Sequence, residues 1–334
     1  MKTLLLSHPA CSLHIAGEFH PERPARLDAV MAGVRRSGLQ VDERTAPRAT
    51  VEQLHAAHDP DYVTEIERFC ERGGGALDRD TVAVPESWEA ARRAAGSGPA
   101  AVDALRSGEG DLAVCAVRPP GHHALADTAM GFCLFNNVAV ATEAVAARGE
   151  TVAIVDWDVH HGNGTQDTYW RRPDVLYVST HQFPFYPGTG WVDETGVGDG
   201  AGTTLNIPLP ALAAGDAARF AYERLVTPAV EQFAPDWLFI SAGYDAHEAD
   251  PLADLRFGSE DYAALAGMLR EIAPRRTVIF LEGGYDLAAI EASVAATLRG
   301  FAGEPAGDGT TGSPTAAFEM IGLAIDAAKR RWND

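Results

Sequence analysis

Cysteine is scarce in this chain of 334 residues, and no two cysteines form a CxxC pair. That scarcity argues against a disulfide framework and against a zinc site built from cysteine. No stretch approaches the roughly 18 consecutive apolar residues that cross a membrane as a helix. The apolar run near the start, Leu4–Leu6, is too short for the core of a signal peptide. We therefore expect a protein of the reducing cytoplasm without a membrane partner.

Positive charge is also in short supply. The chain has 27 Lys and Arg against 47 Asp and Glu, which gives a net charge of −20. Phosphate binding requires clustered Lys and Arg, so the composition argues against nucleic acid as the default partner. A negative excess is compatible with a cationic or neutral small substrate. The apolar share of 46% and the charged share of 22% are typical of globular proteins.

Short apolar runs recur along the chain and alternate with segments of helical composition. The runs predicted as strands cover residues 3–6, 112–117, 152–156, 175–180, 237–241 and 278–281. The predicted helices include residues 137–148, 214–233, 260–272 and 315–332. Apolar runs without alternation suit strands covered on both faces, so the pattern predicts an α/β fold with a mostly parallel sheet. No repeat or composition break divides the chain, and we expect one domain over residues 1–334.

Polar clusters follow four of the predicted strands, at the sheet edge where α/β proteins bind their ligands. In the strongest cluster Asp158 and His160 are two residues apart, so their side chains share one side of an extended segment. A carboxylate and an imidazole that converge suit zinc or a similar divalent ion. Asp245, after another strand, is a natural third ligand. Three protein ligands leave a fourth position open, as in catalytic rather than structural sites.

Two further groups at this edge carry reactive side chains. His122 and His123 follow a Pro-Pro-Gly turn, and a catalytic pair of histidines needs partners that fix each tautomer. Asp156 and Asn163 are the available partners. Tyr285 follows two glycines just beyond a strand, where its phenol could donate a hydrogen bond to a developing oxyanion.

The motifs together resemble the histone deacetylase superfamily, including the class II-like bacterial histone-deacetylase-like amidohydrolases and acetylpolyamine amidohydrolases. They run in family order from His20 to Asp286: HPERPARL, LDRDT, RPPGHHA, GFCLFNN, DWDVHHGNGTQ, FYPGTG, SAGYDAHEADPL and LEGGYD. The resemblance implies an arginase-like three-layer α/β/α fold with a central, mostly parallel sheet of eight strands. It also implies a hydrolase with one zinc ion held by three residues, which match Asp158, His160 and Asp245.

The resemblance assigns roles to the remaining residues of the site. His123 would be the general base and then the acid for the leaving amine, His122 with Asp156 would assist electrostatically, and Tyr285 would stabilise the oxyanion. Family members also bind potassium, and the matching residues are Asp156, Asp158, His160, Ser179 and Thr180. The residues that match the substrate tunnel and its rim are Gly131, Phe132, Tyr186, Leu252 and, more loosely, Asp80 or Asp78. Arg26 matches the arginine of the internal acetate cavity.

The leading hypothesis is a zinc-dependent deacetylase that acts on an acetylated primary amine, most plausibly an acetyl-lysine-like group. An acetylpolyamine amidohydrolase is the nearest alternative, although Leu252 stands where a polyamine-selective relative has an acidic residue. An arginase-like dinuclear manganese hydrolase would need further bridging carboxylates. A silent acyl-ligand binding protein would have lost a ligand, the base or the phenol, and none is lost. The Asp/His/Asp set tolerates Fe²⁺ as well as Zn²⁺. The sequence leaves the oligomeric state open, a homo-oligomer included.

Overall fold

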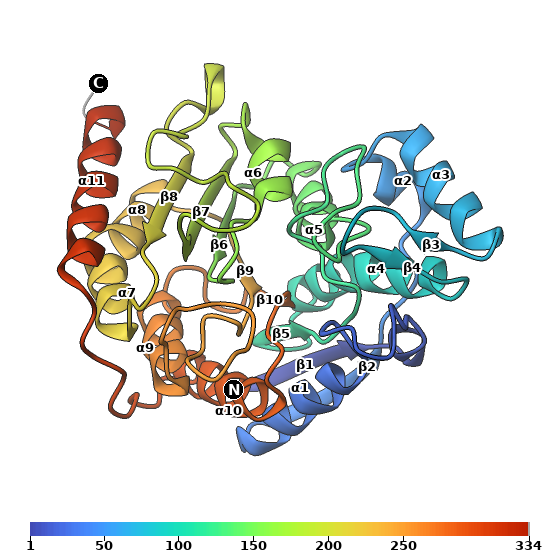
Figure 1. Cartoon of the computed structure of the whole chain (residues 1–334), viewed down its shortest axis with the longest axis horizontal. Helices are drawn as coiled ribbons and strands as arrows, with labels where there is room; N and C mark the ends of the chain where they lie inside the picture. Colours follow the sequence, from blue (N-terminus) through green and yellow to red (C-terminus); the bar gives the residue numbers. More distant parts are fainter. Residues whose placement is uncertain (333–334) are drawn as a thin grey trace.

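The computed structural model describes residues 1–332, and the strands of its large sheet lie in the order β2-β1-β5-β10-β9-β6-β7-β8 (Figure 1). The strands are β1 (Lys2–Ser7), β2 (Gln40–Thr45), β5 (Leu112–Cys115), β6 (Val152–Asp156), β7 (Val175–Gln182), β8 (Thr204–Leu209), β9 (Trp237–Ala242) and β10 (Thr277–Leu281). Every neighbouring pair in this sheet is parallel. A separate antiparallel pair is formed by β3 (Gly75–Ala76) and β4 (Val82–Ala83).

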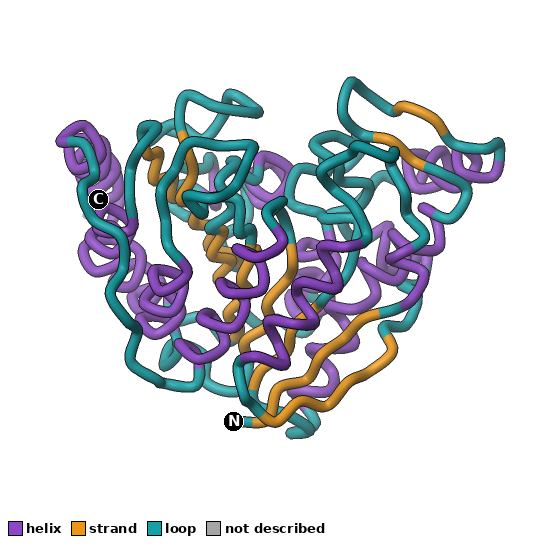
Figure 2. Tube along the Cα trace, turned by 60° about the horizontal axis from the view of Figure 1, so that its bottom comes forward, coloured by secondary structure: helices purple, strands orange, loops and turns teal. Residues whose placement is uncertain are grey.

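Helices flank the sheet, as Figures 1 and 2 show. The α-helices are α1 (Ala25–Arg36), α2 (Val51–His55), α3 (Pro60–Glu71), α4 (Ser87–Arg106), α5 (Asn137–Ala146), α6 (Asn163–Tyr169), α7 (Gly215–Ala221), α8 (Thr227–Phe233), α9 (Ser259–Leu269), α10 (Leu287–Phe301) and α11 (Thr315–Trp332). Short turns of other helix types are η1 (Pro9–Ser12), η2 (Gly198–Gly200) and η3 (Tyr222–Val226). Helix α10 packs between α1 and α9, and α4 packs against α5. The predicted α/β fold is confirmed, and its sheet is parallel throughout.

Two strands of the large sheet, β2 and β8, have no counterpart among the predicted apolar runs. Strand β2 reads QVDERT and lies at an edge of the sheet, where its side chains are half-buried or exposed. Strand β8 is the other edge, but it is fully buried because α11 packs against it. The predicted helix over residues 214–233 is interrupted, since the π-helical turn η3 separates α7 from α8.

The central strands carry the core and fix the place of the functional residues. Every residue of β5, β6, β9 and β10 is buried, as expected for strands covered by helices on both faces. Because these strands are parallel neighbours, the loops that follow them meet at one edge of the sheet. All four cysteines are buried and free. Among residues 1–332, no helix is long and apolar enough to cross a membrane.

Candidate metal centre and active site

Asp158, His160 and Asp245 meet at the carboxyl ends of two neighbouring strands. The first two follow β6, and Asp245 follows β9, which pairs with β6 in the sheet. One ligand atom from each of the three lies within 4.8 Å of the others. The Nδ1 atom of His160 is 3.1 Å from Asp158 Oδ1 and 3.3 Å from Asp245 Oδ2. The structure thus brings the three predicted ligands into one cluster.

The chemistry of this cluster fits a divalent cation. Asp245 Oδ2 is buried and has no hydrogen-bond partner, whereas Asp245 Oδ1 accepts the Val159 backbone N–H at 3.0 Å. Burial raises the pKa of Asp245, and the negative charge of Asp158 raises it further. Two buried carboxylates that repel each other are stabilised by a cation placed between them. Two carboxylate oxygens and one imidazole nitrogen are a donor set that zinc accepts.

Two glycines leave room for these carboxylates. A Cβ atom at Gly283 would overlap both Asp245 Oδ2 and Asp158 Oδ2, and a Cβ atom at Gly243 would overlap Asp158 Oδ2. The backbone N–H of Gly283 instead donates to Asp158 Oδ2 at 2.7 Å. The glycines after β9 and β10 therefore allow the backbone to approach the cluster and orient its carboxylates.

His122 and His123 lie side by side on the loop after β5, with ring centroids 4.1 Å apart. Each ring has its own Nδ1 partner: Asp156 Oδ2 lies 2.9 Å from His122 Nδ1, and Asn163 Oδ1 lies 2.7 Å from His123 Nδ1. The amide oxygen of Asn163 can only accept, so His123 carries its proton on Nδ1 and leaves Nε2 free as an acceptor. The two predicted partners thus bond to different histidines.

The different partners give the two imidazoles different charges. Burial alone would lower the pKa of His122, but the Asp156 and Asp158 carboxylates outweigh burial and raise this pKa to about 10. Burial and the neighbouring His122 and His160 rings hold the pKa of His123 well below its ordinary value. These shifts favour a cationic His122 and a neutral His123 near neutral pH.

Tyr285 extends from the loop after β10 toward the same place and is only 8% exposed. Burial raises the pKa of its phenol well above the ordinary value, and the Asp245 carboxylate adds to the effect, so the phenol keeps its proton. The ring of Phe132 meets the Tyr285 ring edge-on at 6.0 Å, and the Arg26 guanidinium carbon lies 5.0 Å from the Tyr285 ring centroid. A protonated phenol in this position can donate a hydrogen bond to a ligand oxygen.

A cavity of about 220 Å³ connects these groups to the surface. Its lining residues are Asp80, Pro120, His122, His123, Gly131, Phe132, His160, Tyr186, Leu252, Gly283 and Tyr285. The predicted tunnel residues, the predicted base and the phenol therefore line one cavity. Of the two candidate rim residues, Asp80 lines it and Asp78 does not. Tyr186 and Leu252 are partly exposed, and the Tyr186 ring meets the His123 ring edge-on at 5.1 Å. Aromatic side chains, including Phe132, Tyr186 and Tyr285, line much of the cavity, which suits contact with an apolar chain.

Other predicted residues lie behind the cavity. Arg26 is fully buried, and its guanidinium donates to Glu22, to the Gly284 carbonyl oxygen at 2.5 Å and to the Glu282 carbonyl oxygen. Ser179 pairs in register with Asp156 across β6 and β7. The Ser179 hydroxyl is hydrogen-bonded to His181 Nδ1 at 2.9 Å, and the buried Thr180 hydroxyl has no partner.

One aromatic residue of the site was not predicted. The ring of Phe185 stacks on the face of the His160 imidazole, with centroids 5.2 Å apart and planes 20° from parallel. The only signal in the sequence is the aromatic pair in FYPGTG, which does not show which ring faces the tunnel and which faces the histidine.

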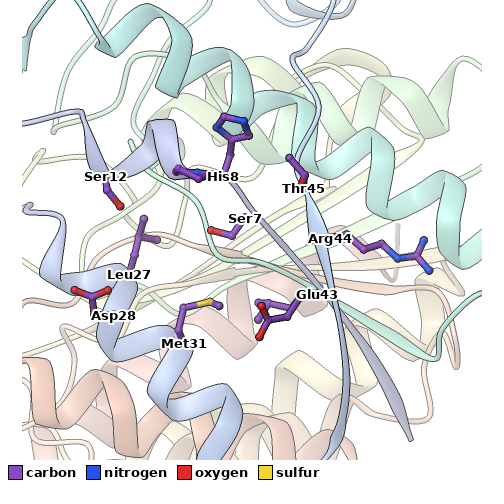
Figure 3. A pocket seen from close by; sticks show the side chains of 11 residues that line it. Ser7, His8, Ser12, Leu27, Asp28, Met31, Glu43, Arg44 and Thr45 are labelled. Carbon is purple, nitrogen blue, oxygen red and sulfur yellow. The ribbon is translucent and has the colours of Figure 1, made fainter.

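A larger cavity lies apart from this cluster. It measures about 440 Å³ between α1 and the ends of β1 and β2, and Figure 3 shows His8, Asp28 and Glu43 around it. Asp28 and Glu43 are exposed, and none of the predicted metal or catalytic residues lines it. Volume alone therefore does not identify the functional site of this chain, whereas convergence of buried reactive groups does.

Comparison with known proteins matches the chain to deacetylases and amidohydrolases. The family model described as the histone deacetylase domain matches residues 20–301. The histone deacetylase-like amidohydrolase of Pseudomonas aeruginosa is 43% identical over 80% of this chain and 72% of the relative. Histone deacetylase 10, chloroplastic, of Oryza sativa is 38% identical over 93% of this chain and 77% of the relative. A probable deacetylase of Methanothermobacter thermautotrophicus is 38% identical over 99% of both chains.

A solved structure agrees with the sequence comparisons. The crystal structure of the HDA15 HD domain superposes with a TM-score of 0.93 at 34% identity, and the match covers 99% of this chain and 95% of that one. The matched segment, residues 20–301, contains the candidate metal cluster, both histidines of the pair and Tyr285. The chain therefore belongs to the histone deacetylase family of deacetylases and amidohydrolases.

Proposed function

We propose that this chain is a zinc-dependent deacetylase that hydrolyses the acetyl amide of an acetylated primary amine, most plausibly an acetyl-lysine-like side chain. We also propose that residues 1–334 act as one catalytic domain. The observation that carries the proposal is the arrangement around the 220 Å³ cavity, where a neutral imidazole, a cationic imidazole and a protonated phenol surround a three-ligand cluster. Together these groups can carry out metal-assisted amide hydrolysis.

Asp158, His160 and Asp245 would hold the zinc ion. When bound, the ion supplies Lewis-acid polarisation of the acetyl carbonyl and makes water more acidic. His123 accepts the proton of the attacking water on Nε2, because Asn163 holds its other proton on Nδ1. The protonated His123 then donates to the leaving amine, so the product departs as a neutral amine rather than as an amide anion.

The remaining polar groups stabilise charge that develops during the reaction. Tyr285 donates its phenol hydrogen to the carbonyl oxygen as that oxygen becomes negative. His122 remains a cation beside Asp156 and so stabilises the negative charge that develops at the reacting centre. We propose that Phe132 and Tyr186 contact the aliphatic linker and that Asp80 binds polar groups at the rim.

Polyamine deacetylation is the second candidate, and one observation favours it. The net charge of −20 attracts substrates with additional positive charges. Leu252, an apolar residue at the mouth of the cavity, favours the lysine-like substrate instead, because it offers no negative charge to a second ammonium group. We also propose that Fe²⁺ can replace Zn²⁺ and that potassium binds at the residues that match the family site, Asp156, Asp158, His160, Ser179 and Thr180.

The deciding experiment compares kcat/KM for an acetyl-lysine peptide, N-acetylputrescine and N-acetylspermidine, with the metal content of the same sample measured. We expect the acetyl-lysine peptide to be the best substrate and one equivalent of a divalent metal per chain. A large preference for the acetylated polyamines would reverse the ranking of the two candidates. Full turnover in protein without a divalent metal would contradict the proposed chemistry.

A further inference from the structure

Asp250 connects the loop that carries Tyr285 with the rim of the cavity. The residue is 7% exposed, and its carboxylate accepts three backbone N–H groups. Asp250 Oδ2 accepts from Tyr285 at 2.6 Å and from Asp286 at 3.3 Å, and Asp250 Oδ1 accepts from Leu252 at 3.0 Å. A carboxyl group has an acceptor oxygen at each of two positions, and both oxygens of Asp250 are used here. The side chain therefore bridges the loop after β9 and the loop after β10.

The hydrogen bond from the Tyr285 N–H to Asp250 differs from the other hydrogen bonds that hold the loop after β10. The Gly283 N–H donates to the Asp158 carboxylate, the Gly283 carbonyl oxygen accepts from Tyr244, and the Gly284 carbonyl oxygen accepts from Arg26. These contacts fix the residues before Tyr285. Gly284 then adopts a left-handed conformation with φ of +111°, so the chain changes direction directly before the phenol. The Asp250 carboxylate holds the backbone of Tyr285 itself after that change.

We propose that Asp250 is a positioning residue that sets the place of the Tyr285 phenol and links it to the cavity rim at Leu252. This inference deepens the proposed deacetylase function and rests on it. Asp250 does not line the cavity, so it acts through Tyr285 rather than on substrate. A displacement of about 1 Å at a reacting group is enough to cost roughly 10²-fold in rate. The binding of an extended substrate, by contrast, depends on Phe132 and Tyr186, the proposed contacts of its aliphatic linker.

The test uses metal-loaded Asp250→Ala and Asp250→Asn, each also combined with Tyr285→Phe. We expect Asp250→Ala to lower kcat by about 10- to 100-fold with KM changed by less than about 3-fold and metal content unchanged. Asp250→Asn keeps the shape but has one accepting oxygen, so we expect a smaller loss. In the Tyr285→Phe background we expect either Asp250 change to have little further effect, because the group it positions is gone.

Asp216→Ala is the matched control. The Asp216 carboxylate also accepts several backbone N–H groups, from Ala217, Gly312 and Ser313, but on α7 and away from the cavity. We expect it to lower thermal stability without a change in kcat. An unchanged kcat in Asp250→Ala, or a full further loss in the Tyr285→Phe background, would overturn the positioning role.

Crystal structures separate this inference from the proposed function. We expect the Tyr285 ring to be displaced in Asp250→Ala and to keep its place in Asp216→Ala, whichever substrate the enzyme prefers. An undisplaced ring would refute the positioning role even if the wild-type protein were active. If the ring is displaced in Asp250→Ala while the wild-type protein hydrolyses none of the acetylated amines, the role of Asp250 is supported and the deacetylase function is refuted.

Discussion

Tyr285 differs from phenylalanine only by its hydroxyl group. Tyr285 lines the cavity, and the raised pKa of its phenol keeps the hydroxyl protonated. We expect Tyr285→Phe to lower kcat by about 10²- to 10³-fold, the usual effect of one oxyanion donor. Metal content measured by atomic emission should not change. Tyr62→Phe is a control, because that phenol donates to the Leu134 carbonyl oxygen at 2.6 Å away from the cavity. Equal losses in both variants would argue against the oxyanion role.

Gly283 tests the metal cluster without removing a ligand. We expect Gly283→Ala to reduce zinc affinity by at least about 10-fold, because its Cβ atom would overlap the Asp158 and Asp245 carboxylates. Competition with a chromogenic chelator measures the affinity directly. A methyl group at Gly322 of α11 meets nothing within 4 Å, so Gly322→Ala should bind zinc normally. Unchanged affinity in Gly283→Ala would place the ion elsewhere.

For individual residues of the site, the sequence predicted the contacts that one side chain makes with another side chain. The spacing of Asp158 and His160, and the pairing of the histidines with Asp156 and Asn163, follow from residue types at strand ends. Asp250 was visible only as part of a motif. Its partners are backbone N–H groups 35 and 36 residues away, and every residue except proline offers such a group. The pattern of side chains therefore carries no signal for that contact.

Secondary structure elements were predictable where their residues form an apolar run, and burial alone was not enough, because the fully buried β8 (TLNIPL) was missed. Strand β6 was predicted at its observed bounds because all five of its residues are apolar or lie at its polar end. Strand β2 was missed since an edge strand with polar side chains has no apolar run. The π-helical turn η3 was also missed, because residues 222–226 are ordinary helix formers and only packing shifts their hydrogen bonds.

A buried cluster of charges joins the first helix to the loop after β5. The Glu22 carboxylate accepts from Arg118 and from Arg26 of α1, and all three side chains are fully buried. Burial alone would raise the pKa of Glu22, but the two guanidinium groups outweigh burial and lower this pKa to about 2. A depressed carboxyl pKa stabilises the folded state above the unfolded pKa, and that stability is lost as the pH falls toward 2.

We therefore expect the Glu22 interaction to weaken in acid by roughly 3 kcal/mol in total, at 1.36 kcal/mol per pKa unit. Urea unfolding of wild type and Glu22→Gln between pH 5 and pH 3 measures this change. The free energies of unfolding should differ most at pH 5, where Glu22→Gln leaves two buried cations without a carboxylate, and should approach each other toward pH 3. A constant difference over that range would mean that Glu22 titrates normally in the folded protein.

The net charge of −20 acts on the scale of the whole molecule. We expect it to accelerate the encounter with cationic substrates, so that kcat/KM for N-acetylspermidine falls several-fold as salt screens the field, whose range is about 10 Å at 0.1 M salt. An acetyl-lysine peptide without other charges should change little. Assays between 50 and 500 mM salt test this, and equal salt dependence of the two substrates would exclude electrostatic steering.

The bond between the Val159 N–H and Asp245 joins the ends of β6 and β9 across 86 residues of sequence. A cation held by Asp158 and Asp245 would tie the same two strand ends a second time, in the middle of the sheet. For the folding chain such an ion is a removable cross-link, and its binding energy adds to the stability of the native state alone. The supply of metal in the cell would then set how long the folded protein survives, as well as how fast it works.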